Sequence, residues 1–222
     1  NIEAGQIAVV AVSPSSGISR VFASLGVAAI VAGGQTMNPC TKDLLDAFEN
    51  LPTDKVIILP NNKNIILTAE QARAVTVKQV KIIPTHNIPQ GLAAMMHLNP
   101  DADLDTVTNK MMRAIEEVIA IEITTATRSV EIDGVLVEEG HVIALINGKL
   151  AVSTDSVEHA CLEALQKANT AEYELITLFH GEQLPPAEAN RIVDVIRSAY
   201  PAQEIEVQDG NQPHYQFIIS VE

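Results

Sequence analysis

Tryptophan is absent from the 222-residue sequence, and all aromatic residues together make up 3% of it. A platform of aromatic rings on which nucleic acid bases could stack is therefore not expected. Basic residues are also scarce, since 14 Lys and Arg face 28 Asp and Glu and the formal net charge is −14. This charge repels phosphate backbones and anionic lipid, so nucleic acids and membrane surfaces are poor candidates for a partner.

Long apolar runs and cysteines are scarce too. No run approaches the roughly 18 to 20 apolar residues that cross a bilayer as a helix, so we expect no membrane span. The N-terminus lacks the charged and then apolar segments of a signal peptide, and the two cysteines are Cys40 and Cys161. Nothing here requires an oxidising compartment, and we expect a cytoplasmic location.

The sequence does contain, at 47% hydrophobic residues, enough apolar side chains for a real core. Short runs rich in Val and Ile predict buried parallel strands at 7–12, 28–31, 56–59 and 80–83. Amphipathic segments predict helices capped by Ser15 or Ser16, Thr41 and Thr68, and further helices after Pro89 and from about Asp103. This alternation predicts an α/β fold with a doubly wound, mostly parallel sheet, in which ligands bind beyond the carboxyl ends of the strands.

After residue 119 the pattern changes to that of a smaller α+β domain. Asp133-Gly134 and Asn147-Gly148 lie within alternating or apolar segments and are typical of type I′ hairpin turns. Helices are predicted at 156–168 and 186–200, and strands at 175–179, 204–207 and 215–221. We therefore divide the chain into domains 1–122 and 123–222, without a flexible linker between them.

Polar segments follow three of the predicted parallel strands and should converge on one rim. The candidate ligand-binding residues in these segments are Gln35, Thr36, Asn38, Asn61, Asn62, Lys63 and Gln90. Their amides, hydroxyl and single cation suit a carboxylate or another polar group. The same loops could instead be capped turns that hold no ligand, because Asn readily bonds its own turn.

Familiar catalytic signatures are missing, and no catalytic residue is predicted. The sequence has no P-loop, no Gly-x-Gly-x-x-Gly after a strand, no Gly-x-Ser-x-Gly and no His-Glu-x-x-His. Residues 13–17, Ser-Pro-Ser-Ser-Gly, place hydroxyls at a helix start but include one glycine and no lysine. This favours ordinary helix capping there over phosphate binding.

Six motifs together resemble one known family. They are Gly-Gly-Gln-Thr-Met-Asn-Pro at 33–39, Leu-Pro-Asn-Asn-Lys-Asn-Ile at 59–65, Ile-Pro-Gln-Gly at 88–91, Arg128 with Asp133-Gly134, His-Gly-Glu at 180–182, and the ending 210–222. The chain resembles the middle and C-terminal domains of the bacterial fatty acid kinase A subunit family, which is dihydroxyacetone-kinase-like and related to DegV proteins. The resemblance covers essentially the whole chain.

In that family the A subunit begins with an ATP-binding domain, and a DegV-like partner holds the fatty acid that is phosphorylated to an acyl phosphate. The resemblance implies that this chain is a fragment that is not catalytic alone and does not bind ATP, although its parent is an ATP-dependent fatty acid kinase. It further implies that domain 1–122 forms a homodimer and that domain 123–222 docks the DegV-like partner.

Two positions depart from the family pattern and suggest a metal. Cys40 stands where relatives commonly have Ser, and His86 where they commonly have Lys. Both follow parallel strands at ends that point the same way, and a thiolate with an imidazole suits zinc. Two ligands are too few, so His97 or a residue of a dimer mate would have to contribute. A buried Cys near an unrelated His is the simpler alternative.

Three functions therefore stay open at this point. The chain could be the assembly and regulatory region of a lipid kinase, a stand-alone domain that binds a fatty acid or small carboxylate, or a structural spacer. The second function needs an apolar tunnel beside the rim. Fatty acid that co-purifies with the protein would distinguish the first two.

Overall fold

The computed structural model describes residues 1–222, which form two compact units, Asn1–Glu117 and Val118–Glu222. The change of pattern that the sequence shows near residues 120 to 125 lies just after this division. The two longest helices have 14 residues each. Crossing a bilayer takes about 20 predominantly apolar residues, and no helix of this chain combines that length and hydropathy.

Four parallel strands form the sheet of the first unit, in the order β2-β1-β3-β4. They are β1 (Ile7–Ser13), β2 (Ala29–Ala32), β3 (Lys55–Leu59) and β4 (Gln79–Ile82). Every residue of β1 is buried, as expected for a central strand covered on both faces. The chain runs from β1 out to β2 and then crosses back to β3, so the strand order reverses between β1 and β3. Ligands of doubly wound sheets bind at such a point.

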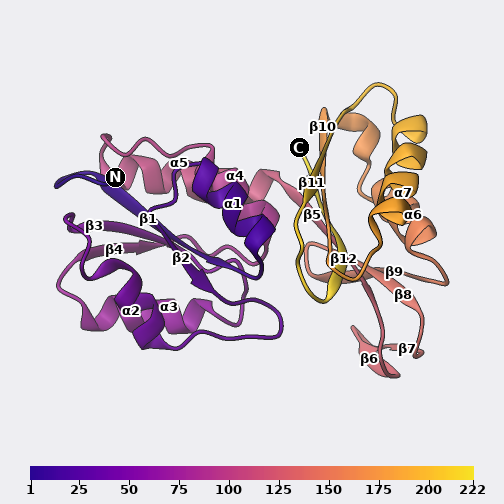
Figure 1. Ribbon diagram of the computed structural model, residues 1–222, viewed down its shortest axis with the longest axis horizontal. Coiled ribbons are helices and arrows are strands. Elements are labelled where there is room, and N and C mark those ends of the chain that lie inside the picture. Colours follow the sequence, from indigo (N-terminus) through magenta and orange to yellow (C-terminus); the bar gives the residue numbers. More distant parts are fainter. The chain divides into compact units, whose positions relative to one another are not determined.

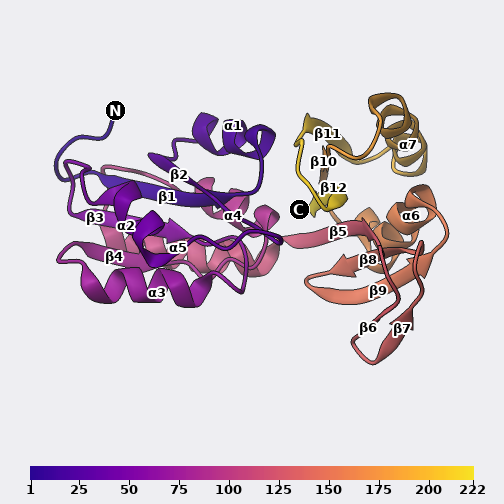
Figure 2. The ribbon, with the colours of Figure 1, turned by 60° about the horizontal axis from the view of Figure 1, so that its bottom comes forward.

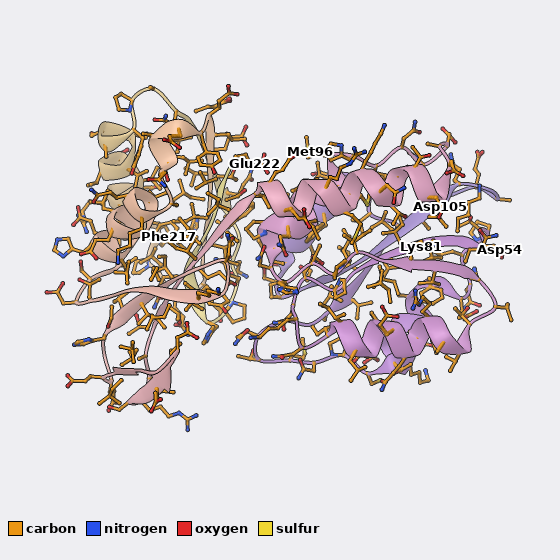
Figure 3. All side chains as sticks on the ribbon, turned by 180° about the vertical axis from the view of Figure 1, so that it is seen from behind. Asp54, Lys81, Met96, Asp105, Phe217 and Glu222 are labelled. Carbon is orange, nitrogen blue, oxygen red and sulfur yellow. The ribbon has the colours of Figure 1, made fainter.

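Five helices cover this sheet on its two faces. They are α1 (Ser16–Ser24), α2 (Thr41–Phe48), α3 (Ile66–Val75), α4 (Ile88–Met95) and α5 (Leu104–Glu117). Figure 1 shows α2 and α3 on one face and α1, α4 and α5 on the other. Phe48 and Ala69 belong to the buried cluster on the first face. Near the second face, Lys81 of β4 and Asp105 of α5 point toward one another in Figure 3, with Nζ and Oδ1 3.3 Å apart. The predicted doubly wound α/β class is confirmed.

Six strands form the sheet of the second unit, in the order β11-β10-β12-β5-β8-β9. They are β5 (Ile119–Thr125), β8 (Val142–Ile146), β9 (Lys149–Thr154), β10 (Leu175–His180), β11 (Glu204–Asp209) and β12 (Tyr215–Val221). Strands β10 and β11 are parallel, and the other neighbours are antiparallel. Helices α6 (Val157–Lys167) and α7 (Pro186–Ala199) pack on one face, where Leu165, Ile192 and Phe217 belong to one buried cluster. A short 3₁₀ helix, Thr170–Glu172, follows α6.

Both predicted hairpin turns form. Asp133 and Gly134 have φ angles of 52° and 78°, and Asn147 and Gly148 have φ angles of 50° and 82°. Type I′ turns require this left-handed backbone at both central residues. The first turn joins β6 (Val130–Ile132) to β7 (Val135–Val137), which pair with each other and with no other strand.

Two predicted helix caps are wrong. The N-cap of α2 is Cys40, and Thr41 is already inside the helix. The reason is Asp43, whose Oδ2 accepts a hydrogen bond from the Cys40 N–H at 2.8 Å and so satisfies the start of the helix one residue earlier. The helix α3 begins at Ile66, so Thr68 does not cap it.

Candidate functional site

The first part of the candidate rim is the loop after β2. Gly34 and Met37 close a tight turn, in which the Gly34 N–H donates to the Met37 oxygen at 2.7 Å and the Met37 N–H donates back at 3.3 Å. Gln35 and Thr36 form the tip of this turn and are exposed, as is Asn38. The turn places these three side chains at the surface.

Asn61 occupies the point at which the strand order reverses. Its Nδ2 donates to the Val12 oxygen of β1 at 2.9 Å, and its N–H donates to Thr85 Oγ1 at 2.9 Å. The amide orientation is therefore fixed, and the buried Oδ1 has no hydrogen-bond partner. A Cβ on Gly91 would lie 2.1 Å from this oxygen. The Asn61 side chain thus fills the place where doubly wound sheets bind their ligands.

Asn62 joins the second and third loops of the rim. Its Nδ2 donates to Gln35 Oε1 at 3.4 Å, and its Oδ1 accepts a hydrogen bond from the Asn64 N–H at 2.9 Å. Asn62 is buried, whereas the neighbouring Lys63 is exposed. The structure therefore brings Asn62 and Gln35 together, while the one cation of the candidate set lies in solvent.

Gln90 fixes the loop after β4. Its Oε1 accepts from the His86 N–H at 2.7 Å, and its Nε2 donates to the Ile115 oxygen of α5 at 3.1 Å. Its own N–H donates to Oδ1 of Asn87, the N-cap of α4, at 2.9 Å. The side chain of Gln90 thus bonds groups of its own unit at both ends of its amide.

The two residues of the zinc hypothesis, Cys40 and His86, are both exposed. The exposure of Cys40 shows that the alternative of a buried cysteine at this position is wrong. No group of three or more His, Cys, Asp or Glu side chains in this chain is placed to hold a metal ion. Zinc at Cys40 and His86 stays a prediction, and it needs a ligand from a second copy or from another part of the parent protein.

A second polar cluster lies in the second unit and is absent from the predicted set of site residues. Gln212 Nε2 donates to the Phe179 oxygen at 2.8 Å and to the Tyr215 oxygen at 3.3 Å, and its buried Oε1 has no hydrogen-bond partner. The Glu182 N–H donates to the Gln212 oxygen at 3.0 Å, which joins the motif at 180–182 to the motif that begins at residue 210. The motifs signalled this cluster only through the family resemblance.

Glu122 on β5 is the ionisable side chain with the most perturbed environment in this unit. Burial raises the pKa of its carboxyl to about 7, against the lowering effect of a hydrogen bond with Tyr215. Burial and the Glu122 carboxylate also raise the pKa of the Tyr215 phenol. The sequence signal for this residue is a single acidic side chain between the apolar Ile121 and Ile123.

Comparison with known proteins extends the resemblance found in the motifs. Residues 8–222 match the FakA-like C-terminal family model, which describes the C-terminal region of the fatty acid kinase A subunit and its relatives. An uncharacterised protein of Staphylococcus epidermidis is 36% identical over 217 residues, which is 98% of this chain and 39% of the relative. The chain therefore spans about two fifths of the length of this curated relative.

Solved structures share the fold at low sequence identity. A DegV family protein of Corynebacterium glutamicum superposes with a TM-score of 0.72 at 14% identity, covering 98% of this chain and 97% of that one. The fatty acid kinase (Fak) B3 protein of Streptococcus pneumoniae, solved loaded with linoleic acid, gives a TM-score of 0.61 at 10% identity and covers 98% and 99%. The fold is that of DegV proteins, and by the match over residues 8–222 the chain belongs to the FakA-like C-terminal family of fatty acid kinases.

Proposed function

We propose that this chain is the non-catalytic assembly region of a fatty acid kinase subunit, which dimerises the kinase and docks a DegV-like fatty-acid-binding partner. The observation that carries the proposal is the family match over residues 8–222, in a chain that spans only 39% of a curated relative. In this view the remainder of the parent protein handles ATP. The present region brings the loaded partner to it, so that the bound fatty acid can be phosphorylated to an acyl phosphate.

The geometry of the rim supports docking over binding of a carboxylate. A carboxylate is held well by cations or by donors aimed at it. Asn61, Asn62 and Gln90 already donate side-chain amide hydrogens to oxygen atoms of their own unit. An anion would have to compete with these bonds, and breaking a buried bond leaves its acceptor unsatisfied at a cost of about 1–3 kcal/mol.

A stand-alone domain that binds a fatty acid or small carboxylate is the second candidate. One observation favours it, namely that the Streptococcus pneumoniae protein of the same fold was solved with linoleic acid bound. The exposed Thr36, Asn38 and Lys63 would supply the polar end of such a site. Lys63 would be its cation.

Calorimetry of this chain with the DegV-like protein of the same genome, loaded with fatty acid, tests the proposal. Docking predicts saturable binding of the partner, together with no stoichiometric fatty acid in mass spectra of the extracted chain. Lys63→Ala is the matched variant, because it should leave docking unchanged but abolish lipid binding under the second candidate. One equivalent of fatty acid on this chain, without partner binding, would reverse the conclusion.

A further inference from the structure

The hairpin of β6 and β7 is a projection that the rim does not use. We call residues 128–139 the arm. Its two strands pair with each other and with no other strand. Figure 2 shows the arm extending from the six-stranded sheet of its own unit beside β8 and β9, as does Figure 1. Each strand of the arm therefore keeps one edge that no strand pairs.

Three anchors keep the arm ordered. Asp133 Oδ2 accepts a hydrogen bond from the Leu150 N–H of β9 at 2.7 Å. The Glu139 N–H donates to Ser129 Oγ at 3.3 Å, and Val137 is fully buried. A lone two-stranded hairpin is marginally stable in water. These anchors hold the arm as a fixed projection, so that its surface is available in a defined shape.

The end of the arm presents apolar side chains to solvent. Val135 is 49% exposed and Leu136 is 68% exposed, and they are the two large exposed hydrophobic residues of the second unit. Consecutive strand residues point to opposite faces, so the arm is solvated on both faces here. Leu136 pairs with Glu131 across the hairpin. One face of the arm thus combines an exposed leucine with a carboxylate.

We propose that the arm is the surface on which the DegV-like fatty-acid-binding partner docks, with Leu136 as its apolar anchor. This inference rests on the proposed function and adds to it the place of contact. The partner surface that fits is an apolar recess rimmed by Lys and Arg, because the arm carries four acidic residues and one arginine. The unpaired strand edges offer backbone groups for strand addition as well.

Charge selects this occupant over a second copy of the chain. Each copy has a formal charge of −14, and two arms in contact would place their carboxylates against one another. Like charges in a desolvated contact are unfavourable, and neither arm has enough cations to neutralise the other. A basic partner removes this conflict.

Leu136→Ser tests the proposal, with Leu67→Ser on α3 as its matched control. The two leucines are 68% and 69% exposed, so both substitutions should leave folding intact, and thermal unfolding of each variant verifies this. We expect Leu136→Ser to weaken binding of the loaded DegV-like partner by about tenfold or more, and Leu67→Ser to leave it unchanged. Glu131→Lys should also weaken binding and reduce its dependence on salt.

The outcomes separate this inference from the proposed function. Equal partner binding by the wild type and Leu136→Ser overturns the arm as the docking surface and leaves the proposed function in place. Absence of partner binding by the wild type overturns the proposed function and the arm assignment with it. Light scattering that finds a smaller oligomer for Leu136→Ser identifies a second copy as the occupant and overturns the inference.

Discussion

Asn61 and Gln212 use the same physical device in the two units. Each buried amide donates through its nitrogen to a backbone oxygen, at 2.9 Å for Asn61 and 2.8 Å for Gln212. Each leaves its oxygen without a hydrogen-bond partner, pressed close to a glycine. A hypothetical Cβ would come within 2.1 Å of the oxygen at Gly91 and 2.0 Å at Gly210. These glycines are therefore required by side-chain packing.

Gly91→Ala should destabilise the protein by about 1–3 kcal/mol, the usual range for an overpacked site. The sign is diagnostic, because Gly91 lies within α4 and an alanine in a helix interior normally stabilises by roughly 0.5–1 kcal/mol. Removing the obstacle with Asn61→Gly should make the added Gly91→Ala neutral or stabilising. Urea unfolding of the four proteins in this cycle measures the coupling. A stabilising Gly91→Ala in the wild-type background would contradict the argument.

Zinc at Cys40 and His86 is a second prediction at this scale. The chain arranges no third ligand, so we expect metal in the dimer and none in Cys40→Ser. Elemental analysis of protein purified without a histidine tag measures it. Cys161→Ser is the control, because that thiol is buried and cannot reach solvent metal. Metal retained in Cys40→Ser, or absent from the wild type, would refute the site.

The composition of the rim could be predicted from the sequence, but its bonding could not. Polar residues after parallel strands necessarily gather at one edge of the sheet, which is why the loops with Gln35, Asn62 and Gln90 are neighbours. Whether their amides face a ligand or the protein depends on atomic distances that no local pattern encodes. The left-handed backbone of Asn61 and its bond to Val12 are of this kind.

At the scale of the element, β5 carries an acidic residue within an apolar strand. Burial raises the Glu122 pKa to about 7 from an ordinary value near 4.5, so the folded state binds the proton more tightly than the unfolded chain does. The free energy of unfolding should therefore fall as pH rises from about 4.5 to 7 and then level off, by up to about 3 kcal/mol.

Glu122→Gln should remove this slope, because the amide does not titrate. Chemical denaturation at several pH values between 4.5 and 8 compares the two proteins. Glu131→Gln in β6 is the control, since Glu131 is exposed and its replacement should leave the wild-type slope unchanged. A wild-type stability that rises with pH relative to Glu122→Gln would contradict the prediction.

Most elements could be predicted because their period is a local property. The strand 215–221 and the type I′ turns at 133–134 and 147–148 follow directly from alternation and from residues that accept a left-handed backbone. The starts of α2 and α3 could not, because more than one residue competes to cap each helix. Asp43 decides the first case by bonding the Cys40 N–H, which favours the earlier start.

At the scale of the whole molecule, the chain spans about two fifths of a curated relative and has no recognisable nucleotide-binding motif. We expect it neither to bind nor to hydrolyse ATP. Calorimetry with Mg-ATP and a phosphate-release assay measure both properties. A micromolar dissociation constant, about −8 kcal/mol, would contradict this expectation and favour an enzymatic function for this chain.

A homodimer in solution is the last prediction, and we expect it to form through the first unit. Six of the eight large exposed hydrophobic side chains lie there, namely Met37, Leu67, Val75, Val77, Met96 and Met112. Burying such side chains favours association, whereas the charge of −14 on each copy opposes it. Added salt screens this repulsion, so the dimer should tighten as ionic strength rises.

Light scattering at tens of micromolar protein, in low and high salt, tests both the mass and the salt dependence. Val77→Ser is the informative variant because Val77 is fully exposed in a single copy, and its replacement should weaken the dimer without unfolding the chain. Leu136→Ser on the arm is the control and should remain dimeric. A monomer under all these conditions would contradict the dimer and remove the assembly half of the proposed function, while docking of the partner would still stand on its own test.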